Sequence, residues 1–193
     1  MYVEAFILAA GLSSRMIKGN KLLRKLNGKP LISNTIENYL NSDLNQISII
    51  TGHDSIKIKS IADSYNINSI HNKKYKKGIL SSIKICLENI SQRTTGVVIA
   101  LGDMPLVSNK DIKPLIKEFK NNKQKEICVP KCYNKNGNPI IFPVKVLKKI
   151  LISLKNDEYD YGLKEIIEKY GYKNVKTSKA ILKDFDNISD FTI

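Results

Sequence analysis

Apolar residues in this chain form short continuous runs that alternate with segments of helical spacing. Each of these runs is rich in β-branched residues, and polar or small residues bound it, as is typical of strands buried in a sheet. The run at 96–101 is apolar throughout and is the strongest strand signal, because a strand covered on both faces lacks polar positions. The predicted strands are 3–8, 46–51, 67–70, 96–101 and 127–130.

Helical periodicity fills the stretches between these runs. Residues 79–90 show it most clearly, with apolar side chains three or four positions apart. The predicted helices are 30–39, 55–65, 79–90, 110–119, 144–151 and 163–170. Strands that alternate with helices predict an α/β fold: a Rossmann-like, mostly parallel central sheet with helices on both faces. There is no internal repeat or linker, so residues 1–193 are expected to form a single domain.

The first predicted strand ends in a loop whose composition suits phosphate binding. Small residues let backbone N–H groups approach a ligand, and two cations, Arg15 and Lys21, add positive charge. The small residues of this loop are Ala9, Ala10, Gly11, Ser13 and Ser14. The spacing matches neither the Walker A motif nor the dinucleotide fingerprint. The alternative is an ordinary strand-to-helix turn with solvated cations.

A carboxylate, Asp103, follows the most apolar strand at the edge where parallel sheets usually bind ligands. A single carboxylate that faces phosphates suits Mg²⁺, which keeps several waters and completes its octahedron with substrate oxygens. The pair of features therefore predicts a magnesium–nucleotide site. The alternative is that Gly102 and Asp103 only cap the helix after Pro105.

Bulk properties narrow the function classes. A formal charge of +14 invites a nucleic-acid role, but only three of the 32 basic residues are Arg, and the Lys are scattered along the chain, so nucleic acid is disfavoured. No apolar stretch is long enough to cross a bilayer. The odd number of Cys and the absence of a basic segment before the apolar run at 6–12 predict a cytoplasmic protein. Cys128 and Cys132 are expected to be packing residues rather than zinc ligands.

The small number of histidines also limits the reactions that the protein is expected to catalyse. Only His53 and His71 exist, and neither can be combined into a convincing Ser-His-Asp or Cys-His arrangement. Acyl transfer is therefore disfavoured, and chemistry that depends on positioning and charge neutralisation is favoured. Phosphoryl and nucleotidyl transfer have these requirements, since an ionised phosphate is already a nucleophile.

Several motifs, in order along nearly the whole chain, resemble the molybdenum cofactor cytidylyltransferase group of the MobA-like nucleotidyltransferases. They are Leu8-Ala-Ala-Gly-Leu-Ser-Ser-Arg-Met16 with Lys21-Leu-Leu, Thr51-Gly-His53, His71-Asn-x-x-Tyr75-x-x-Gly78-x-x-Ser-Ser82, Gly102-Asp-Met-Pro105, Gly137-Asn-Pro139-x-x-Phe142 and Asp184-Phe-Asp186. The resemblance implies a nucleotidyltransferase fold of the GT-A-like kind. It also implies transfer of CMP from CTP, with Mg²⁺, to molybdopterin, and a molybdenum enzyme as the recipient partner.

The resemblance assigns roles to individual residues. Arg15, Lys21 and Asp103 are the expected catalytic residues, and Asp103 and Asp186 the expected metal ligands. The expected nucleotide-binding residues are Leu8, Ala9, Ala10, Gly11, Ser13, Arg15, Lys21, Gly52, Gly78, Ser82 and Asp103. One extra residue separates Arg15 from Lys21 relative to the family, which leaves open whether Lys18 or Lys21 holds the triphosphate.

Alternatives remain for the base and the acceptor. Similar guanylyl-transferring enzymes tend to have Gly where this chain has Ala10, and a methyl group there favours a smaller pyrimidine. A sugar phosphate or alcohol phosphate as acceptor, GTP as donor, and a non-catalytic protein that binds a nucleotide or pterin are the other hypotheses.

Overall fold

The computed structural model describes residues 1–13, 19–153 and 163–191. Within these ranges the main sheet has eight strands, in the order β10-β7-β9-β6-β1-β4-β5, with β8 paired to β7. The strands are β1 (Val3–Ala9), β4 (Gln46–Thr51), β5 (Asn68–His71), β6 (Gly96–Leu101), β7 (Ile127–Cys132), β8 (Lys135–Asn136), β9 (Ile140–Pro143) and β10 (Tyr172–Lys176). A short hairpin of β2 (Lys25–Leu26) and β3 (Lys29–Pro30) lies apart from this sheet.

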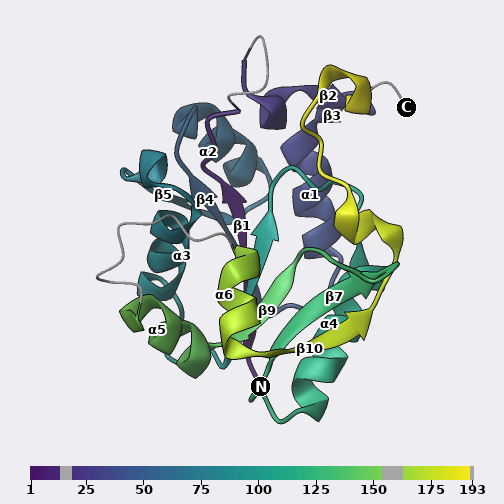
Figure 1. Cartoon of the computed structure of the whole chain (residues 1–193). Helices are drawn as coiled ribbons and strands as arrows, with labels where there is room; N and C mark the ends of the chain where they lie inside the picture. The colour runs from purple at the N-terminus through teal and green to yellow at the C-terminus, as the bar shows by residue number, and fades with distance from the viewer. Residues whose placement is uncertain (14–18, 154–162, 192–193) are drawn as a thin grey trace.

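Helices cover both faces of the sheet (Figure 1). They are α1 (Leu31–Leu40), α2 (Ser55–Ser64), α3 (Ile79–Glu88), α4 (Asn109–Asn121), α5 (Val144–Ser153) and α6 (Leu163–Tyr170). Single 3-10 turns lie at η1 (Lys21–Leu23), η2 (Tyr75–Lys77), η3 (Lys179–Leu182) and η4 (Ile188–Phe191). Among the helices of the described ranges, none is both long and apolar enough to cross a bilayer.

The two faces form separate cores because side chains alternate along each strand. In β1, Val3, Ala5 and Ile7 pack with α1, α2 and α4, whereas Phe6 packs with α3, α5 and α6 on the opposite face. This explains why β1 and β6 are apolar at nearly every position. The α/β architecture predicted from alternating strands and helices is confirmed.

The parallel pairs β6-β1, β1-β4 and β4-β5 form one half of the sheet, and their carboxyl ends meet at one edge. The other half contains the antiparallel strand β9, which lies between β6 and β7. Strand β10 was not predicted. It is an edge strand with a single buried residue, Val175, so it lacks the apolar alternation that identifies strands in a sequence.

Candidate active site

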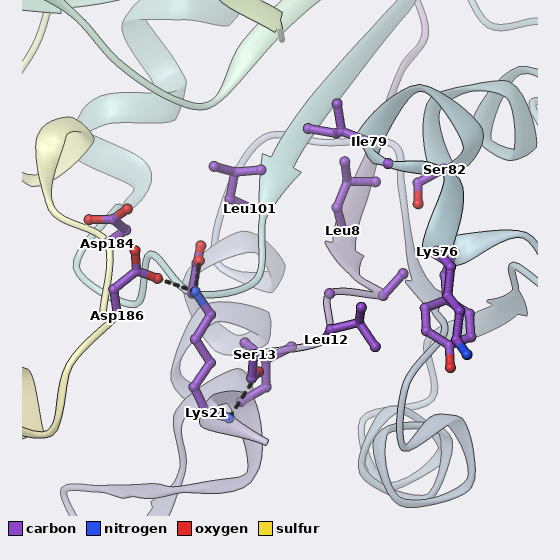
Figure 2. Close-up of a pocket in the computed structure, with 16 residues that line it drawn as sticks. Leu8, Leu12, Ser13, Lys21, Lys76, Ile79, Ser82, Leu101, Asp184 and Asp186 are labelled. Carbon is purple, nitrogen blue, oxygen red and sulfur yellow. Dashed lines mark hydrogen bonds and ion pairs between the residues drawn. The ribbon is translucent and has the colours of Figure 1, made fainter. Parts of the chain in front are cut away.

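A pocket of about 490 Å³ opens at the edge where β1 and β6 end (Figure 2). Its lining combines the end of β1, the start of α3, the turn after β6 and the C-terminal segment around Asp186. The lining residues are Leu8, Ala10, Gly11, Leu12, Ser13, Lys21, Leu22, Tyr75, Lys76, Gly78, Ile79, Ser82, Leu101, Asp103, Asp184 and Asp186. Segments far apart in the sequence therefore share one cavity.

One end of this pocket is charged. The Lys21 ammonium donates to a carboxylate oxygen of Asp103 and, at 2.5 Å, to one of Asp186. Each of these three side chains is less than one-fifth exposed, at 15% for Lys21 and 18% for both aspartates. Figure 2 shows the Lys21 side chain reaching up toward the Asp186 carboxylate. We call these three residues the charged end.

Opposing effects act on the protonation of Lys21. Burial by itself lowers the pKa of the Lys21 ammonium, but the negative charges and hydrogen bonds of Asp103 and Asp186 outweigh it. The net pKa lies above the ordinary value of a lysine. Lys21 is therefore a fixed positive charge at neutral pH, suited to bind an anion rather than to accept a proton.

Asp103 is held by the turn that follows β6. The Gly102 N–H donates to the Leu8 carbonyl at 3.0 Å, and the Thr35 hydroxyl on α1 donates to the Gly102 carbonyl at 2.9 Å. The alternative role of a helix cap is excluded, since α4 begins at Asn109, and Ser108 forms its capping box with Asp111. Asp103 thus faces the pocket, as predicted from its position after the strand.

Asp186 reaches the charged end through its neighbour Phe185. The Phe185 N–H donates to the Asp103 carbonyl at 2.9 Å, and the Phe185 ring is completely buried in the core beneath α1, α2 and α4. The Asp190 carboxylate then accepts the Asp186 and Asn187 N–H groups at 2.9 and 2.8 Å. A buried aromatic anchor and a local turn together place Asp186 beside Asp103.

Side-chain hydrogen bonds join the two chain segments that flank residues 14–18. Ser13, in the left-handed conformation with φ 52°, accepts the Lys21 N–H and donates to the Asn20 side chain, both at 3.2 Å. Asn20 in turn caps η1 by accepting the Leu22 N–H at 3.0 Å. This brings Ser13 next to the start of η1 and points the Lys21 side chain into the pocket.

The opposite side of the pocket is mainly apolar, with the exposed Lys76 at its rim. It is formed by Leu8 and Ala10 of the β1 end together with Ile79 and Ser82 of α3, and we call these four residues the α3 wall. Ser82 is only 4% exposed, and its hydroxyl accepts a hydrogen bond of 3.0 Å from the buried Asn72 amide. A mainly apolar wall with one placed hydroxyl suits a heterocycle better than a phosphate.

The charged end also has the donor set for a divalent cation. The second carboxylate oxygen of Asp103 is buried and has no hydrogen-bond partner among the described residues, although buried oxygens normally have one. No three His, Cys, Asp or Glu residues within the described ranges form a ready-made metal cluster. Two carboxylates without a third ligand fit Mg²⁺ or Mn²⁺ bound jointly with a polyphosphate, since Mg²⁺ commonly takes its remaining ligands from substrate and water.

The structure brings together most of the residues predicted for the site. The predicted residues that line the pocket are Leu8, Ala10, Gly11, Ser13, Lys21, Gly78, Ser82, Asp103 and Asp186. Ala9 does not line it: it is buried in the core, because β1 turns that side chain to the opposite face. Arg15 and Lys18 lie outside the described residues, so the role predicted for Arg15 and the choice between Lys18 and Lys21 stay predictions.

Gly52 also lies behind the pocket rather than in its lining. A Cβ atom added there would come within 2.6 Å of Tyr75 and 2.8 Å of Ala10, so the glycine allows these two residues to pack closely. Gly52 therefore supports the residues that line the pocket and does not itself line it.

Sequence reasoning missed seven lining residues: Leu12, Leu22, Tyr75, Lys76, Ile79, Leu101 and Asp184. Tyr75, Lys76 and Asp184 lie inside motifs that were recognised, so their positions were visible in the sequence. Leu12, Leu22 and Ile79 also lie within these motifs. Leu101 gave no such signal, since an apolar side chain at a strand end looks the same whether it lines a cavity or a core. Cys128 is buried and Cys132 half-buried, as expected of packing residues.

Two curated proteins are similar to this chain in sequence. It is 31% identical over 160 residues to a "Probable molybdenum cofactor guanylyltransferase" of Thermococcus sibiricus, covering 81% of this chain and 76% of that protein. It is 28% identical over 123 residues to the "Bifunctional protein GlmU" of Staphylococcus saprophyticus, covering 63% of this chain. The matched region spans only 27% of GlmU.

Solved structures support the fold. A nucleotidyl transferase from Methanothermobacter thermautotroptrophicus superposes with a TM-score of 0.81 at 18% identity, covering 99% of this chain and 94% of that one. Rv0371C of Mycobacterium tuberculosis, solved as a complex with manganese, gives a TM-score of 0.71 at 18% identity, covering 91% and 87%. The fold is that of the α/β nucleotidyltransferases.

The family follows from a match to residues 5–175. These residues match the model of the MobA-like NTP transferase domain, which accounts for most of the chain. Together with the relative at 31% identity, this match shows that the chain belongs to the MobA-like nucleotidyltransferases.

Proposed function

We propose that this nucleotidyltransferase transfers CMP from CTP to molybdopterin and releases pyrophosphate, with a divalent cation, most simply Mg²⁺, at Asp103 and Asp186. The observation that carries the proposal is the charged end. A buried ammonium lies between two carboxylates, and one carboxylate oxygen has no partner in the described structure. Such a site matches a metal–triphosphate in charge and in donor type.

The residues of the charged end have distinct tasks in this proposal. Asp103 and Asp186 would hold a cation, which would supply the neutralisation of phosphate charge that in-line attack needs. Lys21 would stabilise the pyrophosphate that leaves. The small residues Ala10 and Gly11 leave room for the triphosphate to approach the backbone. Arg15 is proposed as a second cation for the same phosphates.

The choice of CTP rests on Ala10, which lines the α3 wall and is only 6% exposed. A methyl group there narrows the space for the base and favours a pyrimidine. GTP is the second candidate, because the relative at 31% identity carries a guanylyltransferase name. That same name supports molybdopterin as the acceptor and a molybdenum enzyme as the recipient of the product.

One assay tests the activity. Purified protein is incubated with Mg²⁺, molybdopterin and each of CTP, GTP, ATP and UTP, and pyrophosphate release is measured. Fastest release with CTP is the expected result. Fastest release with GTP would replace the cytidylyl proposal by the guanylyl one, and release that does not depend on molybdopterin would mean transfer to water and contradict molybdopterin as the acceptor. No release with any nucleotide would favour a binding protein without turnover.

A melting experiment tests the base independently of the acceptor. A ligand that binds only the native state raises the melting temperature, and at equal concentration the tighter ligand raises it more. With Mg²⁺ and equal concentrations of the four nucleotides, CTP is expected to give the largest rise. A larger rise with GTP would contradict the role given to Ala10.

A further inference from the structure

Asn72 lies behind the α3 wall and donates a hydrogen bond to the Ser82 hydroxyl within it. Asn72 is 1% exposed, and its backbone N–H is fixed by a 2.8 Å hydrogen bond to the Thr51 carbonyl at the end of β4. Its side-chain oxygen accepts the Lys74 N–H at 2.9 Å. A backbone N–H can only donate, so this contact identifies which side-chain atom of Asn72 is the oxygen.

The other side-chain atom of Asn72 must therefore be the amide nitrogen, which has two hydrogens to donate. They go to the hydroxyls of Ser81, at 2.9 Å, and Ser82, at 3.0 Å. The Ser81 hydroxyl itself donates a hydrogen bond of 2.8 Å to the Gly78 carbonyl, just before α3, so its hydrogen already has an acceptor. All the polar atoms of the Asn72 side chain are thus engaged.

Ser82 differs from Ser81 in one respect. Its oxygen accepts from Asn72, but no acceptor for its hydrogen exists among the described residues, and the residue lines the pocket. A hydroxyl that is held as an acceptor on one side is left to donate on the other. Figure 2 shows the Ser82 oxygen on the pocket side of the start of α3, across the cavity from Lys21.

We infer that Asn72 is a positioning residue that fixes Ser82 as a hydrogen-bond donor to the nucleobase, and that this polarity selects cytosine over guanine. The inference rests on the proposed function and deepens it. On its pairing edge cytosine offers two adjacent acceptors, O2 and N3, whereas guanine offers two adjacent N–H donors beside the single acceptor O6. A site built to donate leaves the guanine donors unpaired, which costs binding energy.

Two molecules in the proposed reaction carry such hydrogen-bond acceptors: the nucleotide, in its base, and molybdopterin, in its heterocycle. The nucleobase is favoured because Ser82 shares its wall with Ala10, which belongs to the same strand end and loop as the phosphate-binding residues. A triphosphate held by Lys21 at the charged end extends its nucleoside across the pocket toward this wall.

The test compares three ligands: Mg²⁺ with CTP, with GTP and with inorganic tripolyphosphate, which has the charge but no base. Calorimetric titration of each with the wild-type protein gives the reference affinities. Ser82→Ala is expected to weaken CTP binding by about 3- to 10-fold, the effect of one hydrogen bond, and to leave tripolyphosphate binding unchanged. Equal weakening of both ligands, or none, would overturn the inference.

Asn72→Asp inverts the polarity with almost no change of shape. A carboxylate still accepts the Lys74 N–H, but it now also accepts the Ser82 hydrogen, so the serine faces the pocket as an acceptor. The ratio of CTP affinity to GTP affinity is expected to fall by about tenfold, because CTP loses a hydrogen bond while GTP can gain one. An unchanged ratio in a folded variant would overturn the inference, and the Ser82→Ala result decides it if this variant does not fold.

Ser81→Ala is the matched control, because Ser81 is held by the same amide but does not line the pocket. Its ratio of CTP to GTP affinity is expected to equal that of the wild type, and a fall like that of Ser82→Ala would contradict the inference. Separate titration with molybdopterin distinguishes the two sources of a heterocycle: weaker molybdopterin binding in Ser82→Ala, with CTP unaffected, would overturn the assignment to the nucleobase. Failure of the wild type to bind any of the magnesium complexes would instead contradict the proposed function itself.

Discussion

The charged end and the α3 wall face each other across one pocket but are built in different ways. The charged end joins residues 82 and 165 positions apart, through Lys21, Asp103 and Asp186. The hydroxyl of the α3 wall is positioned locally, since Asn72 and Ser82 are only ten positions apart and belong to one loop and the helix that follows it. The ion pairs of the charged end depend on long-range folding, and the direction of the Ser82 hydroxyl depends on a short segment.

The charged end and the α3 wall also differ in their chemistry. The charged end pairs one positive charge with two negative charges, so a metal–triphosphate would have to exchange these ion pairs for its own. The α3 wall presents hydrogen bonds of fixed direction that need no rearrangement. This contrast predicts that changes at the charged end affect metal binding and turnover, whereas changes at the α3 wall affect the choice of base.

The largest effect is expected from Asp103→Asn. The amide keeps the shape of the side chain but removes the charge that holds the cation, so pyrophosphate release is expected to fall by about 10²- to 10³-fold while the melting temperature without ligand changes little. Asp184→Asn is the matched control, since Asp184 lines the same pocket but lies exposed. Near-normal turnover in Asp103→Asn, or an equal loss in Asp184→Asn, would contradict the role of Asp103.

Lys21→Gln tests whether the ammonium competes with a cation for the carboxylates. Without it, Mn²⁺ alone is expected to bind about tenfold more tightly in a titration, a gain of about 1.4 kcal/mol, while turnover falls. Lys76→Gln removes the same charge from the pocket rim, where the side chain is exposed, and is expected to leave Mn²⁺ binding nearly unchanged. Weaker Mn²⁺ binding in Lys21→Gln would show that the lysine assists the cation instead.

Gly52→Ala tests the support of the α3 wall. The new methyl group would overlap Tyr75 and Ala10, and such overpacking costs about 1 to 3 kcal/mol of unfolding free energy. Gly11→Ala is the control for stability, because no atom lies within 4 Å of a Cβ atom added at that position. Chemical denaturation measures both. Equal stability of the two variants would show that the contact between Gly52, Tyr75 and Ala10 relaxes without cost.

The smallest effect is expected from Asp190→Asn, which loosens the turn that presents Asp186. The hydrogen bond from Lys183, followed by the N–H groups of Asn187 and Asp186, holds the pKa of the Asp190 carboxyl below its ordinary value of 3.8. A lowered pKa means that the stabilisation is present above pH 3.8 and is lost as the pH falls through the lowered value. At pH 7 the variant is expected to lose at most about 1 kcal/mol, since the pair lies near the surface.

Denaturation at pH 7 and at progressively lower pH checks this prediction, because the difference between wild type and variant is expected to vanish in acid. Asp63→Asn is the control. Asp63 pairs with Lys59 at 2.8 Å on the exposed face of α2, so little change is expected. A pH-independent difference for Asp190→Asn would contradict the electrostatic explanation.

Most of the parallel half of the sheet was predictable from the sequence. The strand bounds predicted at 46–51 and 96–101 are those observed, since these runs are apolar enough to be recognised without tertiary information. The prediction that Asp103 faces the loop after β1 is confirmed, because the carboxyl ends of parallel neighbours meet at one edge. Strand β10 was missed, since three of its five residues are exposed.

The sequence by itself determined the elements and the chemistry available at the end of β1: small residues, a nearby lysine, and a carboxylate after β6. Local periodicity and residue type carry that information along the chain. Only the tertiary structure decided that Lys21 lies between Asp103 and Asp186, because the burial of Phe185 and its hydrogen bond to Asp103 bring the C-terminal segment to the pocket. Only the structure, too, shows that Asn72 directs Ser82, since the direction of a hydrogen bond depends on every partner that surrounds it.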